Sequence, residues 1–262
     1  MATTLFTEFI DKYSDDPVSF VRDILECEPD PWQKDLMEAS LPNSGHRLCA
    51  VKSGHGVGKS TTASWISLHN IICQYPQKTV LSSPTSSQLF DALFAELKSQ
   101  LNRLPPALKN LFEVSSDRIV LKADPSGSFI SCRTSRKEQP EALQGIHSDR
   151  VLLIVDEASS VDNAVFESAG GSLSGNATLI LLGNPTRPEG YFYDAFTRLS
   201  DKWWTKTVSS EESVRVSKEY VKELEDRYGR DSQTFRIRCL GEFPETSEDT
   251  LISNALVESA VT

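Results

Sequence analysis

The chain has 262 residues, of which 39% are hydrophobic, and carries 37 acidic against 27 basic side chains, a formal net charge of −10. This balance argues against sequence-independent nucleic-acid binding by the surface as a whole, although it leaves room for a local basic strip. No run of about 18 apolar residues occurs and the five cysteines form no CxxC pair, so neither a membrane span nor a zinc site is expected.

The first 46 residues predict a helical segment. Apolar side chains recur at helical spacing within residues 6–13 and again within 20–25. A turn built on two prolines follows, and residues 32–37 are expected to open a third helix.

Buried strands and helices are expected to alternate from about residue 47 to 185. Unbroken apolar runs such as 151–155 are typical of parallel strands that are covered on both faces. The pattern predicts a doubly wound α/β domain with a mainly parallel central sheet flanked by helices. Together with the phosphate-binding motif described next, it indicates an α/β fold of the P-loop NTPase class (ASCE/RecA-like). The remaining expected elements are strands at 47–52, 79–83, 178–182 and 203–208, a hairpin over 118–133, and helices at 60–73, 88–101, 218–228 and 232–240.

Residues 53–61 read Ser-Gly-His-Gly-Val-Gly-Lys-Ser-Thr, which is the pattern of a phosphate-binding loop. Its glycines allow backbone N–H groups to turn inward and approach a phosphate closely. Lys59 would reach the β- and γ-phosphates of ATP, and the Ser60 hydroxyl would lie on Mg²⁺. The general pattern has a glycine at the position of Ser53, which is a departure. The expected ATP-binding residues of the loop are Gly54, Gly56, Gly58, Lys59, Ser60 and Thr61.

Polar side chains follow two of the predicted strands. Asp156 comes directly after the run 151–155 and would hold Mg²⁺, while Glu157 would polarise the water that attacks the γ-phosphate. Asn184 follows the next strand and could sense the γ-phosphate or the attacking water; the alternative is an ordinary Asn-Pro turn. Because ligands in open α/β sheets bind at the carboxyl ends of strands, the set predicts nucleotide hydrolysis.

The order and spacing of these motifs resemble the ATPase domain of the large terminase subunit of tailed bacteriophages, over roughly residues 18–244. The resemblance implies that Gln33 reads the edge of the adenine base with Trp32 packed nearby, and that Asn184 links hydrolysis to movement. The segments that carry it are 31–33, 54–61, 83–88, 155–158, 183–186 and 240–243.

The same resemblance implies a function. ATP hydrolysis with Mg²⁺ would power the translocation of double-stranded viral DNA into a procapsid. The partners would be the DNA, further copies of the chain in a ring, the portal protein and the small terminase subunit. The place of action would be the host cytoplasm, transiently at the procapsid portal.

The chain departs from the family at one charged position. Many terminases have an arginine four residues before the loop lysine, where this chain has His55. A neutral imidazole is a poor substitute for a guanidinium group, so the charge-stabilising arginine must come from elsewhere. A neighbouring subunit could supply it, and solvated surface charge is the alternative for each candidate. The candidates are Arg133, Arg136, Arg150 and Arg187.

The family usually continues into a nuclease domain, for which residues 244–262 are too few, so nuclease activity is not expected. The predicted division is a helical segment with the adenine-side motif at 1–46, an ATPase core at 47–210, a helical subdomain or linker at 211–244, and a tail at 245–262. The competing interpretations are a helicase-type DNA translocase, a nucleotide-binding structural module without turnover, and a small-molecule kinase.

Overall fold

The structure is a computed structural model that describes residues 2–138, 140–146, 148–170 and 176–245. An eight-stranded sheet forms its centre. In chain order, the strands are β1 (Leu48–Ser53), β2 (Lys78–Ser83), β3 (Phe112–Val114), β4 (Arg118–Leu121), β5 (Phe129–Thr134), β6 (Val151–Val155), β7 (Ala177–Gly183) and β8 (Trp204–Val208).

The sheet is mainly parallel, as predicted. Its spatial order is β3-β4-β5-β2-β6-β7-β1-β8, and every pairing from β5 to β8 is parallel. Only the edge formed by β3 and β4 is antiparallel, which confirms the expected hairpin. The carboxyl ends of β2, β6, β7 and β1 therefore lie along one edge of the sheet.

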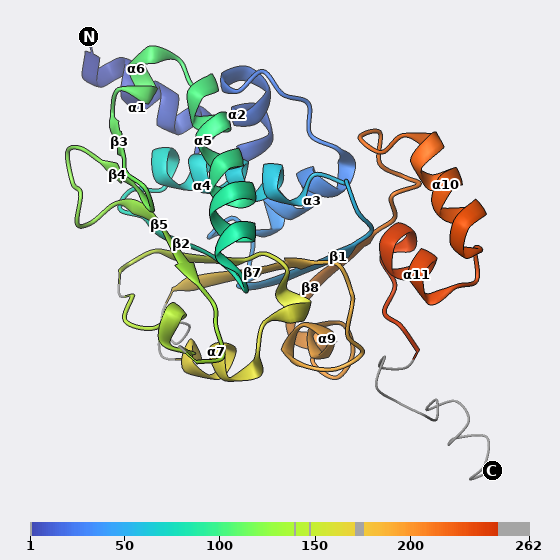
Figure 1. Cartoon of the computed structure of the whole chain (residues 1–262). Coiled ribbons are helices and arrows are strands. Elements are labelled where there is room, and N and C mark those ends of the chain that lie inside the picture. Colours follow the sequence, from blue (N-terminus) through green and yellow to red (C-terminus); the bar gives the residue numbers. More distant parts are fainter. Residues whose placement is uncertain (1, 139, 147, 171–175, 246–262) are drawn as a thin grey trace.

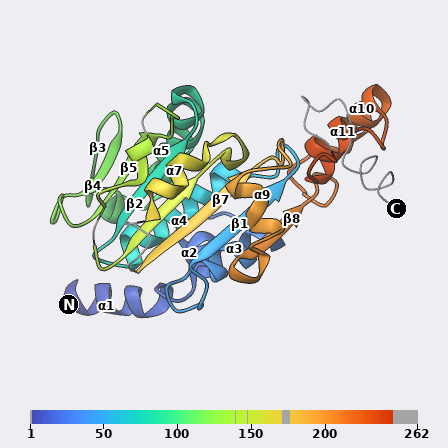
Figure 2. The same cartoon turned by 90° about the horizontal axis from the view of Figure 1, so that it is seen from below.

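Helices cover both faces of the sheet. Figures 1 and 2 show α2 to α5 on one face and α7 and α9 on the other. The bounds of the helices are α1 (Ala2–Tyr13), α2 (Pro17–Ile24), α3 (Pro31–Ala39), α4 (Lys59–Cys73), α5 (Phe94–Arg103), α6 (Pro106–Lys109), α7 (Asn163–Ser168), α9 (Tyr191–Phe196), α10 (Lys218–Tyr228) and α11 (Gln233–Phe235). Three 3₁₀-helices are η2 (Pro140–Leu143), η3 (Ala158–Ser160) and η4 (Ser200–Lys202), and two π-helices are η1 (Gln88–Leu93) and η5 (Arg236–Leu240).

Two apolar cores follow from the alternation of side chains along the buried strands. In β6, Leu152 and Ile154 belong to the core under α4, whereas Leu153 and Val155 belong to the core over α7. Both sets are almost fully buried, so the strand reads as a continuous apolar run in the sequence.

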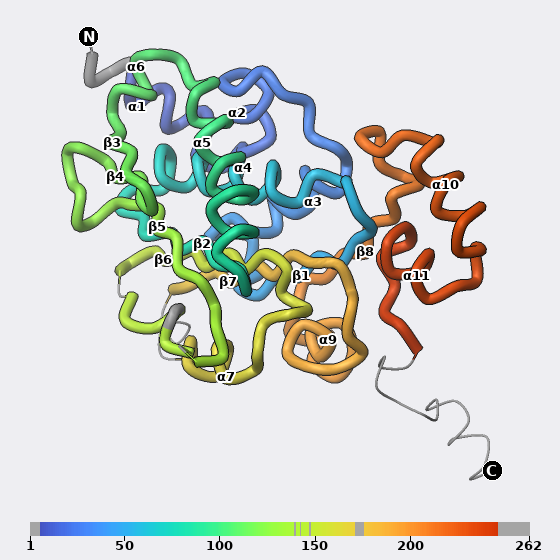
Figure 3. The backbone as a smooth tube through the Cα atoms, viewed as in Figure 1, coloured from blue at the N-terminus to red at the C-terminus, as the bar shows by residue number. Residues whose placement is uncertain are grey.

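The C-terminal helices form a small unit beside β8. Figures 1 and 3 show α10 and α11 as a pair to one side of the sheet, reached through the loop that follows β8. Leu224, Phe235 and Cys239 form its own small core. No helix in the described ranges is long and apolar enough to cross a bilayer.

Candidate functional site

The loop between β1 and α4 has the backbone that the sequence predicts for a phosphate-binding turn. Gly56 and Gly58 have φ angles of 77° and 92°, in the left-handed region that side chains other than glycine rarely adopt. Val57, between them, is 1% exposed and anchors the turn in the core. The loop ends at the N-terminus of α4, where free N–H groups and the helix dipole favour an anion.

Side-chain alternation brings polar groups from separate strands to the α4 side of the sheet edge. Val51, Ile154 and Leu182 belong to the core on this face. The residues two positions later are Ser53, Asp156 and Asn184, so the period of two directs them to the same side.

The Lys59 ammonium lies among these groups. Its Nζ donates to Ser53 Oγ and to Asn184 Oδ1, both at 3.3 Å. Asn184 is fixed in turn, because its Nδ2 donates to the Ser53 carbonyl oxygen at 2.6 Å. Ser53, at the position where the general pattern has glycine, is fully buried and helps to hold the loop lysine.

Ser60 and Asp156 meet across the site. Ser60 Oγ donates to Asp156 Oδ2 at 3.4 Å, so two hard oxygen donors lie together, one in the first turn of α4 and one directly after β6. Burial raises the pKa of the Asp156 carboxyl, and the charge of Lys59 opposes that rise. No cluster of three acidic, histidine or cysteine ligands occurs within the described ranges. One hydroxyl and one carboxylate nevertheless fit Mg²⁺, which is usually held by few protein ligands together with water and phosphate oxygens.

Glu157 occupies a strained and partly buried position. Its φ angle is 52°, which is unusual for a residue other than glycine. Burial, followed by repulsion from Asp156, raises the pKa of its carboxyl, while Lys59 and the Asn184 backbone N–H act in the opposite direction. A Cβ atom at Gly183 would come within 3.1 Å of the Ala158 backbone nitrogen, so a glycine there allows β7 to approach the acidic turn.

A cavity of about 350 Å³ lies over these groups. On one wall, Thr61 Oγ1 donates to Glu96 Oε1 of α5 at 2.9 Å. Glu96 is not predictable from the sequence, because nothing in its local pattern shows that α5 faces the first turn of α4. The lining residues are Gly56, Val57, Gly58, Lys59, Ser60, Thr61, Ala92, Glu96, Asp156 and Glu157.

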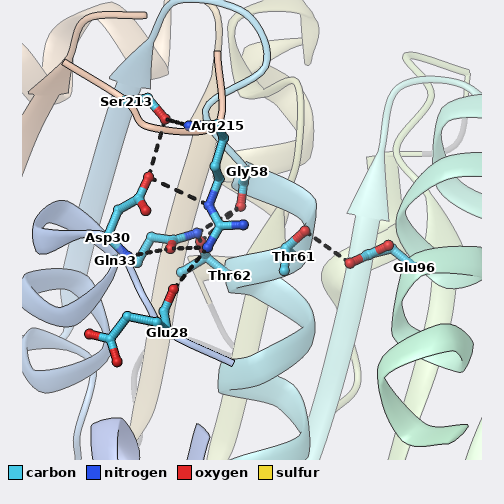
Figure 4. A network of polar contacts seen from close by, with 9 residues as sticks. All are labelled: Glu28, Asp30, Gln33, Gly58, Thr61, Thr62, Glu96, Ser213 and Arg215. Carbon is cyan, nitrogen blue, oxygen red and sulfur yellow. Dashed lines mark hydrogen bonds and ion pairs between the residues drawn. The ribbon is translucent and has the colours of Figure 1, made fainter. Parts of the chain in front are cut away.

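The predicted adenine-side residues lie behind the loop. Gln33 is fully buried, and its Nε2 donates to Thr62 Oγ1 at 2.8 Å and to the Gly58 carbonyl at 3.3 Å (Figure 4). Trp32 is 5% exposed, and its indole N–H finds no hydrogen-bond acceptor among the described residues. Their contact with a base remains a prediction.

The candidate arginines do not gather at the loop. Arg133 lies on β5, four strand spacings or about 19 Å from β1, and donates to the Gln144 carbonyl. Arg150 precedes β6, at the opposite edge of the sheet, and donates to Gln74. Arg136 and Arg187 are exposed. Within one chain, no candidate arginine contacts Lys59 or the acidic pair in the described structure.

The start of the loop is held by segments from the C-terminal part. Gly54 N donates to the Val208 carbonyl at 3.0 Å, and His55 N donates to the Arg238 carbonyl at 2.8 Å. Ser210 Oγ donates to the His55 carbonyl. Burial lowers the pKa of the His55 imidazole, with contributions from the Lys59 and Arg238 charges, so His55 stays neutral near pH 7.

Comparison with known proteins finds a family model and a curated relative that are both large terminase subunits. The family described as "Terminase large subunit, T4likevirus-type, N-terminal" matches residues 51–258. A probable large terminase subunit of Enterobacteria phage P7 is 33% identical over 253 residues, covering 91% of this chain and 50% of that protein. The chain thus spans about half the length of this curated relative.

Solved structures show the same fold at low sequence identity. The large terminase ATPase domain of Thermus phage P74-26 matches with a TM-score of 0.64 and 17% identity, covering 87% of this chain and 99% of that domain. The large terminase of another thermophilic bacteriophage, in complex with ADP, matches with a TM-score of 0.63 and 14% identity, covering 81% of this chain and 53% of that chain. These matches agree with the predicted P-loop NTPase fold.

Proposed function

The chain belongs to the family of phage large terminase subunits, and we propose that it hydrolyses ATP with Mg²⁺ to drive double-stranded viral DNA into a procapsid. The observation that carries this proposal is the convergence of Lys59, Ser60, Asp156 and Glu157 on one cavity at the sheet edge. The solved large terminase with ADP bound supports a nucleotide as the ligand.

Each group has a role that follows from its position. Lys59 would bind the β- and γ-phosphates, and its present contacts with Ser53 and Asn184 keep it directed across the loop. Ser60 and Asp156 would hold Mg²⁺, which offsets the charge of the phosphates when bound. Glu157, with its raised pKa, would orient the attacking water and accept its proton.

Asn184 would report loss of the γ-phosphate. It contacts both the lysine and the end of β1, so a change at Lys59 reaches the strand that leads to the loop. In the proposed motor this change would be passed on to DNA. Several copies of the chain would form a ring in the host cytoplasm, transiently docked on the procapsid portal, with the portal protein and the small terminase subunit as partners. DNA contacts mainly to phosphates would weaken as salt rises.

Two substitutions test the site. Lys59→Ala should abolish ATP binding or turnover, because it removes the cation that faces the phosphates. Glu157→Gln should bind ATP with near-normal affinity and lose about 100-fold or more in turnover, since the amide cannot accept a proton. Binding of labelled ATP and phosphate release measure the two effects separately.

Undiminished hydrolysis by Glu157→Gln would contradict the role of Glu157. ATP binding without any turnover by the unmodified chain, with and without DNA, would instead favour the nucleotide-binding structural module. A helicase-type translocase would show turnover stimulated by single-stranded rather than double-stranded DNA.

A further inference from the structure

Arg215 lies in the loop between β8 and α10 and reaches back to the N-terminal helices. Its Nη2 donates to Gln33 Oε1 at 3.2 Å and to the Glu28 carbonyl at 3.1 Å. Its Nε lies 3.5 Å from the Asp30 carboxylate, which is 6% exposed, and 31% of the arginine side chain remains exposed. The guanidinium carbon lies 5.6 Å from the centre of the Trp65 ring.

These contacts decide which way the Gln33 amide faces. The carbonyl oxygen accepts from Arg215 and from the Asp30 backbone N–H, whereas the amino group donates to the Gly58 carbonyl and to Thr62. If the Gln33 amide were rotated by 180°, its NH₂ group would face two other donors, the Asp30 backbone N–H and Arg215 Nη2. Arg215 and Asp30 therefore hold the amino group toward the phosphate loop.

Arg215 also touches the loop directly. A Cβ atom at Gly58 would lie 3.0 Å from Gln33 Nε2 and 3.1 Å from Arg215 Cδ. Gly58 is the left-handed residue that precedes Lys59, so both side chains pack against the turn that sets the direction of the lysine. Figure 4 shows Asp30, Gln33 and Arg215 on one side of the first turn of α4 and the Thr61–Glu96 pair on the other.

We infer that Arg215 is a positioning residue, which fixes the Gln33 amide against Gly58 and Thr62 and thereby preforms the phosphate loop for nucleotide. This inference rests on the proposed function. All four hydrogen-bonding positions of the Gln33 amide are used inside the protein, so in this arrangement the amide shapes the loop and is not free to bind a base. The anchor itself comes from the loop that leads into the C-terminal helices.

The test is the affinity for ATP-γ-S, measured by titration calorimetry on the full chain. Arg215→Ala should weaken binding about fivefold to tenfold, because a loop that is no longer held must be ordered by the ligand. The effect should fall on KM more than on kcat, since Lys59, Asp156 and Glu157 are untouched. Arg215→Lys should recover part of the loss, because an ammonium can pair with Asp30 but cannot replace the whole fork.

A double-mutant cycle separates positioning from a general loss of stability. In a Gln33→Ala background, Arg215→Ala should have a much smaller further effect on nucleotide affinity, because the amide is gone and only the packing of Arg215 against Gly58 remains to be lost. Arg230→Ala is the matched control: Arg230 belongs to the same C-terminal unit, but pairs with Glu211 and Glu225 rather than with the loop. It should leave the affinity unchanged.

The sign of the change is decisive. If Gln33 must release Arg215 in order to bind adenine, Arg215→Ala would tighten ATP binding and sharpen the preference for ATP over GTP. Tighter binding of this kind would overturn the inference, and so would an unchanged affinity. If the unmodified chain binds no nucleotide, the proposed function fails first. Should Arg215→Ala be unfolded, Arg215→Lys alone must show the weakened binding.

Discussion

At the scale of single residues, Glu157 combines features that each disfavour the folded state. Its positive φ angle is of a kind that costs about 1–3 kcal/mol in residues other than glycine. Its carboxyl is also partly buried beside Asp156, which raises its pKa. Such strain is tolerated where the position is useful, and here it places a carboxylate at the wall of the cavity.

Glu157→Gln should therefore stabilise the protein while it stops hydrolysis. At pH 7 we expect the free energy of unfolding to rise by about 1 kcal/mol, because the amide carries no charge for burial to disfavour or for Asp156 to repel. The raised pKa of Glu157 fixes the sign of the pH dependence. Glu157 lowers the free energy of unfolding only at pH values at which its carboxyl is ionised in the unfolded chain. The gain should shrink as pH falls toward 4 and both states become protonated. Urea unfolding at several pH values measures it, and a constant gain across pH would contradict the cause.

Residues of the site differ in how far the sequence could predict them. Lys59, Ser60 and Asp156 were predicted together and the structure brings them together, since each belongs to a local motif at the end of a parallel strand. Glu96 and Arg215 were not predicted, because their relation to the loop depends on packing between segments that are distant in sequence.

At the scale of elements, α4 joins the site to the N-terminal helices. Its first turn carries Ser60 and its last turns are buried under α1 and α2. His69, near its end, is 1% exposed and its Nε2 lies 2.8 Å from the Tyr13 carbonyl, where the neutral ring donates a hydrogen bond. Burial lowers the pKa of His69 to about 4.

This histidine predicts acid sensitivity of the helical layer. The pKa of His69 in the folded chain lies below the ordinary value of 6.5. At pH values between the two, His69 is therefore protonated in the unfolded chain and neutral in the folded chain. Between pH 6.5 and 4, His69 should cost up to about 1.4 kcal/mol of unfolding free energy per pH unit. His69→Gln keeps a donor for Tyr13 and should show a shallower decline in chemical denaturation. Equal slopes for the two proteins would exclude His69 as the cause.

The long elements were predicted well and the short ones less so. The parallel strands, α4 and α10 follow from apolar runs and helical periodicity. The expected helix at 88–101 is instead a π-helical stretch, η1, that continues into α5. The short elements β3, α7 and α9 gave no signal of their own, because three to six residues are too few to show a period. The predicted domain boundaries remain a prediction.

At the scale of the whole molecule, none of the four candidate arginines contacts Lys59 or the acidic pair in the part of the chain that the structure describes. The candidate arginines are exposed or lie far from Lys59, as described above. Charge that develops on a transferred phosphoryl group is commonly met by an arginine from a neighbouring subunit. Assembly into a ring would then complete each site.

ATPase activity should therefore rise more steeply than protein concentration. The specific rate is measured across a dilution series, and a flat rate would indicate a self-sufficient monomer. Mixing Lys59→Ala with a variant that lacks the donor arginine should restore some activity, because one mixed interface keeps both groups. Absence of rescue for Arg133, Arg136, Arg150 and Arg187 alike would count against donation between subunits.

The attachment of the phosphate loop to distant parts of the chain also bears on how the protein is made. The backbone N–H groups of Gly54 and His55 donate to the carbonyls of Val208 and Arg238. A ribosome that has released only the strands and helices up to β7 has not yet delivered the segments that brace the loop. Competence to retain ATP should consequently arise late in synthesis, and stalled nascent chains ending before residue 238 should fail to bind it.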